Sequence, residues 1–393
     1  MNNTAVESGA GIYVEQQAAP TFSDMYVAGN TAAVGAGAFL TGSSTPKFTN
    51  VTFEGNTAVQ TGGAVESHLE CDPVFTNCSF VSNTAGREGG AIYATGLLTG
   101  SEFLSTITMS GCDFVANGAA TSDGGAVYAA SSVEVVASRL LFARNLGRVG
   151  GALMIAENSV VFACQHCSFV SNVASSAGGA VYIAAAFPPF CSAWTNITSF
   201  NNSAGFFGGG AYLGNPTGTS EACADRWQQE FFAPSAMNTA PYFGPAVASA
   251  SVAVRLVNTT RRYAIPNAPL TVQVEVVDVF SQRVVLPADP GSVHGMELLV
   301  YVVVVENTMG GRVVGTASWT VSHLGLATVS GVTITHGYYA EQLNVSLGAV
   351  PPLTPAALRL EIQHCPAGYV CVVLVSNVVR RRLTALLTPG VHL

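Results

Sequence analysis

The chain has little charge and almost no lysine. Only 10% of its 393 residues are charged, and Lys47 is the single lysine. Basic residues are scarcest in the first half of the chain, since residues 1–215 carry 13 acidic but only 5 basic side chains. Because nucleic-acid binding relies on clustered lysine and arginine, no nucleic-acid partner is expected.

Long apolar runs are missing as well. A membrane helix needs roughly 18 or more apolar residues in succession, and the runs at 298–305 and 370–379 are shorter than that. The arginines at 380–382 resemble a stop-transfer flank, but a strand followed by an irregular tail is the better interpretation. A membrane connection is therefore expected only through regions outside this sequence. Residues 1–215 also lack a sustained 3.6-residue period, which argues against paired helices.

What the sequence does contain is a phrase repeated eight times. A clear copy reads Phe80-Val-Ser-Asn83, followed by Gly89-Gly90-Ala91-Ile92-Tyr93. The asparagines recur in steps of 26 to 34 residues, at positions 3, 30, 56, 83, 117, 145, 172 and 202. Such self-similarity is typical of a solenoid whose units stack on one another. A step of about 27 residues suits three short strands and three turns, so 1–213 is predicted to form a parallel β-helix of about eight coils, with an incomplete first coil.

Two columns of the repeat are predicted to hold the coils in register. The asparagine tolerates left-handed backbone and can bond turn amides, so that aligned copies form a ladder, and the glycine pair permits positive φ where coils pack closely. These residues are Asn56, Asn83, Asn117, Asn145 and Asn172, with Gly89, Gly90, Gly124, Gly125, Gly150, Gly151, Gly178 and Gly179. The 34-residue step predicts a bulge at a turn around 96–103.

In each repeat an aliphatic residue stands shortly after the glycine pair, as Ile92 does after Gly89 and Gly90. The position directly after this aliphatic residue usually holds a tyrosine. Glu66 occupies the same column, which indicates that the column faces solvent and the aliphatic column faces inward. Aligned aromatics could pack on sugar faces or on a partner protein. The predicted ligand surface, if the coils bind anything, is Tyr93, Tyr128, Tyr182 and Tyr212. The alternative, that tyrosines only shield the strand edges, stays open.

Nine cysteines and seven histidines give no convincing metal or redox motif. Cys164-x-x-Cys167 lacks a second pair at zinc spacing and the context of a thioredoxin motif, so interior packing is the better interpretation. Cys78 and Cys112 share one column on adjacent coils, and either form a disulfide or pack as small hydrophobic residues. No metal or cofactor is expected.

Seven Asn-x-Ser/Thr sequons favour a eukaryotic secretory route. Besides Asn2, the candidate glycosylation sites are Asn50, Asn77, Asn196, Asn201, Asn258 and Asn344. With a surface rich in Ser, Thr and Asn, they predict an extracellular or cell-surface location. Because a solenoid needs a terminal cap and the first coil is incomplete and uncapped, a fragment of a longer protein is expected. The absence of a secretory signal from this sequence is then uninformative about the compartment.

The second half changes pattern. Residues 214–247 interrupt the repeat as a cap or linker, in which a short helix at 220–232 is expected to place Trp227 and Phe231 over the open end of the coils. From 248 to 363, six or more alternating strands with Pro and Gly turns predict a β-sandwich. Residues 364–393 form an irregular tail.

The pairing of Phe-x-x-Asn with Gly-Gly-Ala-(Ile/Val/Leu) resembles the repeat of chlamydial polymorphic outer-membrane proteins, which also occurs in eukaryotic right-handed β-helix proteins. The resemblance covers roughly 1–213 and implies a pectin-lyase-like right-handed helix, surface display and adhesion. The stretch 276–284 is similar to immunoglobulin-like modules of large surface proteins. Cys365-Pro-Ala-Gly-Tyr-Val-Cys371 resembles the start of an ephrin-receptor-like cysteine-rich module. Together they favour the eukaryotic surface type.

Three functions compete. The leading one is a non-catalytic adhesion or scaffold protein whose partners are surface glycans or other surface and matrix proteins. A polysaccharide lyase or glycoside hydrolase on the same fold would need clustered charges. The best cluster is Glu66, Glu70, Asp72 and Glu88 near Arg87, and solvated surface acids are the better interpretation of it. The Asn-Thr-Asp, Gly-His-Gly and Arg-Ile-Lys elements of polygalacturonases do not occur. A passive cell-wall or matrix glycoprotein is the third possibility.

Overall fold

The computed structural model divides into two compact units, Met1–Ala250 and Ser251–Leu393. It describes the whole chain except residues 97–104, 120, 122, 131, 157–160, 187–192, 217–218, 232–235, 258–262, 265–268, 286–298, 308–311, 315–317, 321, 336–342, 351–355, 365–369 and 376–393. The bulge predicted around 96–103 falls almost wholly outside the described residues.

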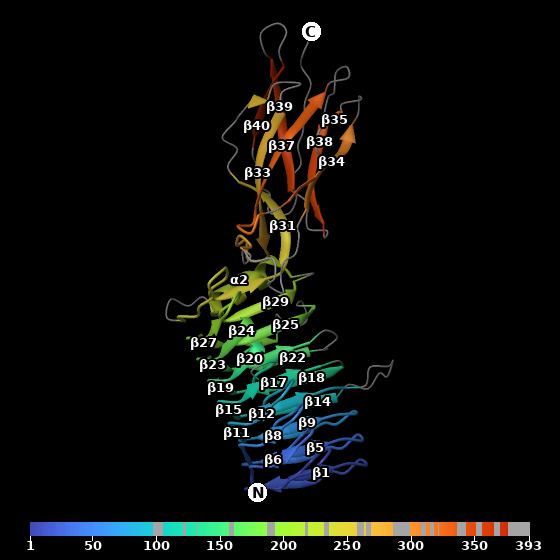
Figure 1. Cartoon of the computed structure of the whole chain (residues 1–393), viewed down its shortest axis with the longest axis vertical. Helices are drawn as coiled ribbons and strands as arrows, with labels where there is room; N and C mark the ends of the chain where they lie inside the picture. Colours follow the sequence, from blue (N-terminus) through green and yellow to red (C-terminus); the bar gives the residue numbers. More distant parts are fainter. Residues whose placement is uncertain are drawn as a thin grey trace. The chain divides into compact units, whose positions relative to one another are not determined.

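The first unit is a solenoid of four parallel sheets, each running along the stack of coils (Figure 1). The first sheet contains β1 (Ile12–Val14), β5 (Ala38–Leu40), β9 (Val65–Ser67), β13 (Ile92–Ala94), β17 (Val127–Ala129), β21 (Leu153–Ile155), β25 (Val181–Ala186), β29 (Ala211–Asn215) and β30 (Val247–Ser249). The second contains β2 (Thr21–Ser23), β6 (Lys47–Thr49), β10 (Val74–Thr76), β14 (Ser105–Ser110), β18 (Val133–Ser138), β22 (Val161–Gln165) and β26 (Trp194–Thr195).

The third and fourth sheets complete each coil. The third contains β3 (Tyr26–Ala28), β7 (Thr52–Glu54), β11 (Ser79–Val81), β15 (Asp113–Val115), β19 (Leu141–Ala143), β23 (Ser168–Val170) and β27 (Thr198–Phe200). The fourth contains β4 (Thr31–Ala32), β8 (Thr57–Ala58), β12 (Thr84–Ala85), β16 (Gly118–Ala119), β20 (Leu146–Val149), β24 (Val173–Ala177) and β28 (Ser203–Ala204). A coil thus has four strands where the sequence predicted three, because a two-residue strand is too short to show alternation.

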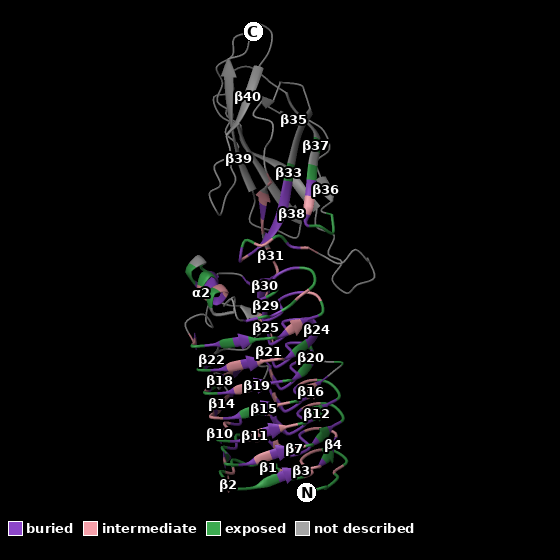
Figure 2. Cartoon of the chain, turned by 90° about the vertical axis from the view of Figure 1, so that its left-hand side faces the viewer, coloured by how far each residue is buried: buried purple, intermediate pink, exposed green. Residues whose placement is uncertain are grey.

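Buried positions recur along every coil of the solenoid (Figure 2), and stacked phenylalanines are among the largest buried side chains. In the third sheet, successive rings lie 5.1, 4.6, 4.8 and 4.9 Å apart in the series Phe53, Phe80, Phe114, Phe142 and Phe169. All five are fully buried. Offset-stacked rings at this separation stabilise a core beyond their buried area, so this phenylalanine column stabilises the stacking of the five coils that carry it.

The repeat asparagines form one buried hydrogen-bonded ladder. Asn117, for example, accepts hydrogen bonds from the backbone N–H and the Nδ2 of Asn83, both at 3.0 Å. Its own Nδ2 donates to the Phe80 carbonyl at 2.9 Å and to Asn145 Oδ1 at 3.1 Å. The same pattern links the positions Asn3, Asn30, Asn56, Asn83, Asn117, Asn145, Asn172, Asn202 and Asn238. Each asparagine therefore satisfies backbone groups that a bare turn would leave unpaired.

The two glycines of each pair have different tasks. The first has a positive φ, for example 65° at Gly89 and 67° at Gly178, a region that favours glycine. The second has no room for a side chain, because a Cβ on Gly90 would overlap the carbonyl oxygen of Gly125 in the next coil. Gly124 and Gly150 repeat the first role, and Gly125, Gly151 and Gly179 the second.

Helix α2 (Glu221–Phe231) is an insertion in the solenoid. Trp227 is 1% exposed and packs on Trp194, with ring centroids 5.1 Å apart. After the helix the coil resumes, since Asn238 continues the ladder and β30 pairs with β29. The expected helix is thus present with its tryptophan over the core. The expectation that the repeat stops near 213 was wrong, because the inserted helix lengthens the step to 36 residues and hides a ninth copy.

The second unit consists of antiparallel strands in two sheets. One contains β31 (Ser251–Leu256), β33 (Pro269–Asp278), β37 (Leu326–Thr335) and β35 (Arg312–Val314). The other contains β32 (Tyr263–Ala264), β40 (Val370–Val375), β39 (Ala356–His364), β38 (Leu343–Val350), β34 (Leu299–Asn307) and β36 (Ser318–Thr320). The immunoglobulin-like identity stays a prediction. The segment around Cys365 lies outside the described residues.

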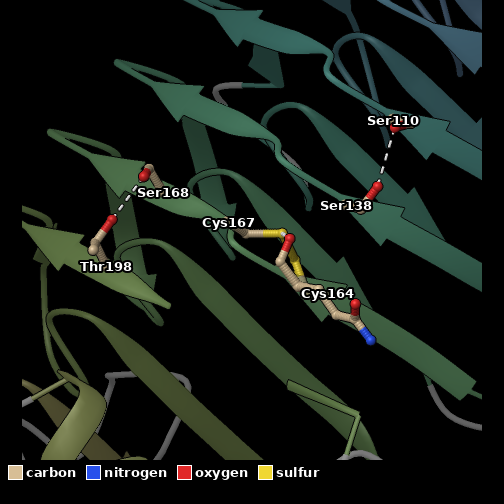
Figure 3. Close-up of a disulfide and its surroundings, with 7 residues drawn as sticks. Ser110, Ser138, Cys164, Cys167, Ser168 and Thr198 are labelled. Atoms are coloured by element: carbon tan, nitrogen blue, oxygen red, sulfur yellow. Dashed lines mark hydrogen bonds between the residues drawn. A yellow bond between two sulfur atoms is a disulfide. The ribbon is translucent and has the colours of Figure 1, made fainter. Parts of the chain in front are cut away.

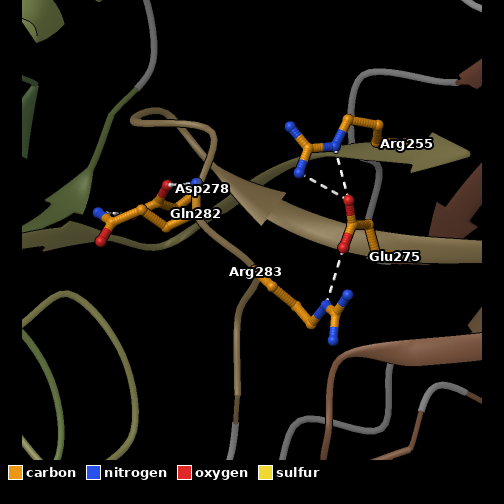
Figure 4. Close-up of polar contacts among 5 residues, drawn as sticks. All are labelled: Arg255, Glu275, Asp278, Gln282 and Arg283. Atoms are coloured by element: carbon orange, nitrogen blue, oxygen red, sulfur yellow. Dashed lines mark hydrogen bonds and ion pairs between the residues drawn. The ribbon is translucent and has the colours of Figure 1, made fainter. Parts of the chain in front are cut away.

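A buried carboxylate ties two strands of this unit together (Figure 4). Glu275 is 6% exposed, and its two oxygens accept from Arg255 Nε at 2.7 Å and from Arg283 Nε at 2.8 Å. Asp278, 2% exposed, accepts from the backbone N–H groups of Phe280 and Gln282 and so closes the turn after β33. The stretch 276–284 is therefore a tightly bonded hairpin.

The disulfides differ from expectation. Cys164 and Cys167 are bonded to each other, with Cα atoms 6.0 Å apart (Figure 3). Cys78 and Cys112 are free thiols instead, and the Cys78 N–H donates to the Cys112 sulfur at 3.4 Å. The pairing suggested for Cys78 and Cys112 was therefore wrong, and these two residues pack as small interior groups.

Candidate functional site

The candidate site is the outer face of the first sheet, where one side chain per coil points away from the core. The strand register aligns Tyr13, Phe39, Glu66, Tyr93, Tyr128, Met154, Tyr182 and Tyr212 in one column. All four tyrosines of the predicted ligand surface therefore lie in this column. Met154 separates Tyr93 and Tyr128 from Tyr182 and Tyr212.

Within each pair the tyrosine rings are stacked. The centroids of Tyr93 and Tyr128 are 5.5 Å apart at 14°, and those of Tyr182 and Tyr212 are 5.2 Å apart at 24°. All four side chains are partly buried. Since the ring faces contact each other, the column presents ring edges and phenol hydroxyls to solvent. Burial raises the pKa of Tyr128 to about 12, with the neighbouring Tyr93 adding to the effect.

Glu66 lies in this column but is not a solvated acid. It stands between Phe39 and Tyr93 in the strand register and is only 5% exposed. One carboxyl oxygen accepts from the Thr61 hydroxyl at 2.5 Å. Burial, together with the charge of Glu88, raises the pKa of Glu66 to about 7. The inference from the sequence was right about the face and wrong about solvation, because aromatic neighbours and the turn before the glycine pair cover the carboxyl group.

Two further acids flank the tyrosines from the turn that precedes the glycine pair. Burial raises the pKa of Glu88, and Asp123 on the next coil adds to this. Asp123 pairs with Arg148 at 2.9 Å, yet burial still raises its pKa. Asp123 and Arg148 were not predicted from the sequence. The signal that could have found Asp123 is its place directly before Gly124, which matches the place of Glu88 before Gly89.

Only part of the predicted acidic cluster assembles. Glu66 and Glu88 are close enough to influence each other. Glu70 instead accepts from the hydroxyl of Ser43 at 3.2 Å, and Asp72 accepts from the backbone N–H of Thr106 at 2.7 Å. Arg87 is exposed. The four carboxylates therefore do not form one constellation.

The sequons of the solenoid have a structural explanation. Asn50, Asn77 and Asn196 occupy the same corner between the second and third sheets, and each has a φ near +53°, at 54°, 52° and 54°. Asn201, at the next corner, has a φ of 54°. Asparagine is one of the few residues that adopts this backbone conformation readily. The residue two positions after each asparagine is the first residue of the next strand, at a position not fully buried, which suits Thr or Ser. All four asparagines are exposed. Asn258 lies outside the described residues, and nothing is described of the Asn344 side chain.

No group of three or more His, Cys, Asp or Glu side chains in the described part of the chain is arranged to hold a metal ion. No helix among the described residues is long and apolar enough to cross a membrane.

Comparison with known proteins agrees with the solenoid. Residues 1–140 match the family model described as the right-handed β-helix region. The chain is a β-helix repeat protein. Neither a curated protein nor a solved structure matches the chain significantly. The β-helix architecture serves both enzymes and non-enzymes, so the activity has to be argued from the site.

Proposed function

We propose that the chain is a non-catalytic adhesion or scaffold protein of the cell surface or extracellular space. The observation that carries this proposal is the outward column of the first sheet, in which Tyr93–Tyr128 and Tyr182–Tyr212 form rigid stacked pairs. Tyrosine contributes large contact area at low cost in conformational entropy. The partners are surface glycans or other surface and matrix proteins.

The placement of the carboxylates supports binding rather than catalysis. Asp72 and Glu70 are engaged by Thr106 and Ser43, and Asp123 is paired with Arg148. Four exposed sequon asparagines at the corners support a secreted, glycosylated solenoid.

The test is cell-binding and glycan-array signal of the expressed chain. The double variant Tyr93→Ser/Tyr128→Ser should lose about tenfold in affinity, or about 1.4 kcal/mol, while keeping its β-rich circular dichroism. The matched control is Tyr13→Ser, which removes an exposed tyrosine from the same column. Unchanged binding by the folded double variant would remove this pair from the site. A chain without any binding signal would point to the passive matrix role.

A hydrolase is the second candidate, and one observation favours it. A carboxyl group with a pKa of about 7, as at Glu66, can hold a proton at neutral pH as a general acid must. Incubation with polygalacturonate, with and without calcium, and with neutral polysaccharides tests this. Turnover that disappears in Glu66→Gln and persists in Asp72→Ala would establish the enzyme and overturn the adhesion proposal.

A further inference from the structure

The last coils of the solenoid differ sharply from the first in charge. No Asp, Glu, Lys or Arg occurs between residues 158 and 220, and none between 231 and 254. The charged side chains between these stretches all belong to α2. The surface built by β23 to β30 outside the helix is therefore formally neutral, whereas the earlier coils carry all 13 acids of residues 1–215.

An aromatic cluster lies on this neutral part. Phe207 is at its centre, with ring centroids 4.9 Å from Phe243, 6.0 Å from Tyr212 and 6.2 Å from Tyr242. Phe206 lies 5.7 Å from Tyr242. Phe207 and Phe243 are buried and form the floor, while Tyr242 is 37% exposed and Phe206 is partly exposed. The exposed ring of Tyr242 therefore packs on the buried ring of Phe207, and Phe206 packs beside it.

Ring orientation separates this cluster from the stacked tyrosine pairs. Phe207 and Tyr242 are inclined by 60° and Phe206 and Tyr242 by 30°, compared with 14° and 24° within the two stacked tyrosine pairs. Tilted rings do not cover one another's faces completely. The exposed Tyr242 therefore offers both a ring face and a hydroxyl, which is the combination that packs on the C–H face of a sugar ring and bonds its hydroxyls.

We propose that the aromatic surface formed by Phe206 and Tyr242, supported from below by Phe207 and Phe243, binds an uncharged polysaccharide. Charge complementarity supports an uncharged ligand. Outside α2, an anionic polymer finds no cation on these coils and a cationic one finds no carboxylate, whereas a neutral glycan loses no ionic solvation on docking. Thr239, Pro241 and Pro245 are exposed on the same coil and add uncharged contacts. The inference rests on the proposed adhesion function and names the ligand class of a second patch.

The experiment is native affinity electrophoresis of the full chain in gels cast with hydroxyethyl cellulose, glucomannan or dextran. Polygalacturonate and chitosan serve as charged polymers. The chain should be retarded by at least one neutral polymer, and the retardation should be unchanged between about 0.05 and 0.5 M salt, since screening acts only on charges.

Variants locate the surface. Tyr242→Ser should weaken retardation about tenfold, and Tyr242→Trp should retain it. The matched control is Tyr26→Ser, because Tyr26 is also an exposed tyrosine but lies in β3, outside the tyrosine column, with the carboxylate of Glu54 beside it. Tyr26→Ser should change the affinity less than about twofold.

The outcomes distinguish this inference from the proposed function. Retardation by charged polymers alone, or equal losses in Tyr26→Ser and Tyr242→Ser, would overturn the neutral-glycan surface. Cell binding without retardation in any neutral polymer would overturn it too and leave the adhesion function standing. A protein partner that competes at Tyr242 would replace the glycan as occupant. Absence of all binding would overturn both proposals.

Discussion

Removing one asparagine from the middle of the ladder should destabilise the solenoid much more than removing one from its end. In Asn117→Ala, the Asn83 backbone N–H loses its acceptor, and the Phe80 carbonyl and Asn145 each lose a donor. All of these groups are buried. An orphaned buried N–H costs about 1–3 kcal/mol and each of the two other lost hydrogen bonds about 0.5–1.5 kcal/mol, so the total is about 2–6 kcal/mol.

The matched control is Asn3→Ala. Asn3 donates its Nδ2 to Asn30 at 3.0 Å, but Asn3 is exposed, and its backbone N–H keeps the same acceptor after truncation. Its loss should cost less than about 1 kcal/mol, since water can replace one exposed hydrogen bond.

Urea unfolding followed by circular dichroism gives the shift in midpoint, and hydrogen exchange of the Asn83 amide reports the local effect. Faster exchange at Asn83 in Asn117→Ala, with little change in Asn3→Ala, is the expected result. Equal midpoints for the two variants would refute the view that the ladder satisfies buried backbone groups.

Three further predictions concern single features. Glu66 has a pKa of about 7 when folded and an ordinary value of 4.5, so the folded state holds the extra proton between these values, and stability should fall as pH rises through that window. Glu66→Gln should remove this pH dependence and stabilise the chain by up to about 3 kcal/mol above pH 7; parallel pH profiles of midpoints would count against it. Alkylation of the unreduced, denatured chain should label Cys78 and leave Cys164 unmodified, which peptide mapping can show. Reducing the Cys164–Cys167 disulfide opens a loop of four residues and should lower the free energy of unfolding by about 2 kcal/mol. Glu275→Gln should destabilise the second unit by about 1–3 kcal/mol, because both of its arginine partners lose a charged acceptor; an unchanged unfolding midpoint would contradict this.

The spacing of the sequence was enough to predict the coil register. Phe80, Asn83 and Gly89 recur at nearly constant offsets, and the structure aligns these columns strand by strand. The regularity was informative because every coil must present the same hydrogen-bonding groups to the next. The outward direction of the tyrosine column was predicted from the alternation of side chains along a strand, in which successive residues face opposite sides.

The rest depended on features that periodicity does not carry. The burial of Glu66 depends on which side chains stand on the adjacent coils. The bond between Cys164 and Cys167 arises because a corner at His166, with a φ of 55°, turns two interior positions of neighbouring sheets toward each other. The ninth copy was missed because Asn238 lies beyond an inserted helix. Each of these requires the three-dimensional path of the chain.

The direction of the hydrogen bonds has a mechanical consequence. In the solenoid the strands run across the stack, so the backbone bonds between coils, such as Leu141 N–H to the Cys112 carbonyl at 3.0 Å, point along its axis, as does the Asn117–Asn145 bond. A tensile load applied evenly along that axis would stretch all the bonds of one coil junction together, whereas a load applied at one edge would break them one after another. The Trp227–Trp194 contact ties the inserted helix α2 to the coil that contains β26. A solenoid built in this way would resist axial pull best where its attachment spreads the force over a whole coil.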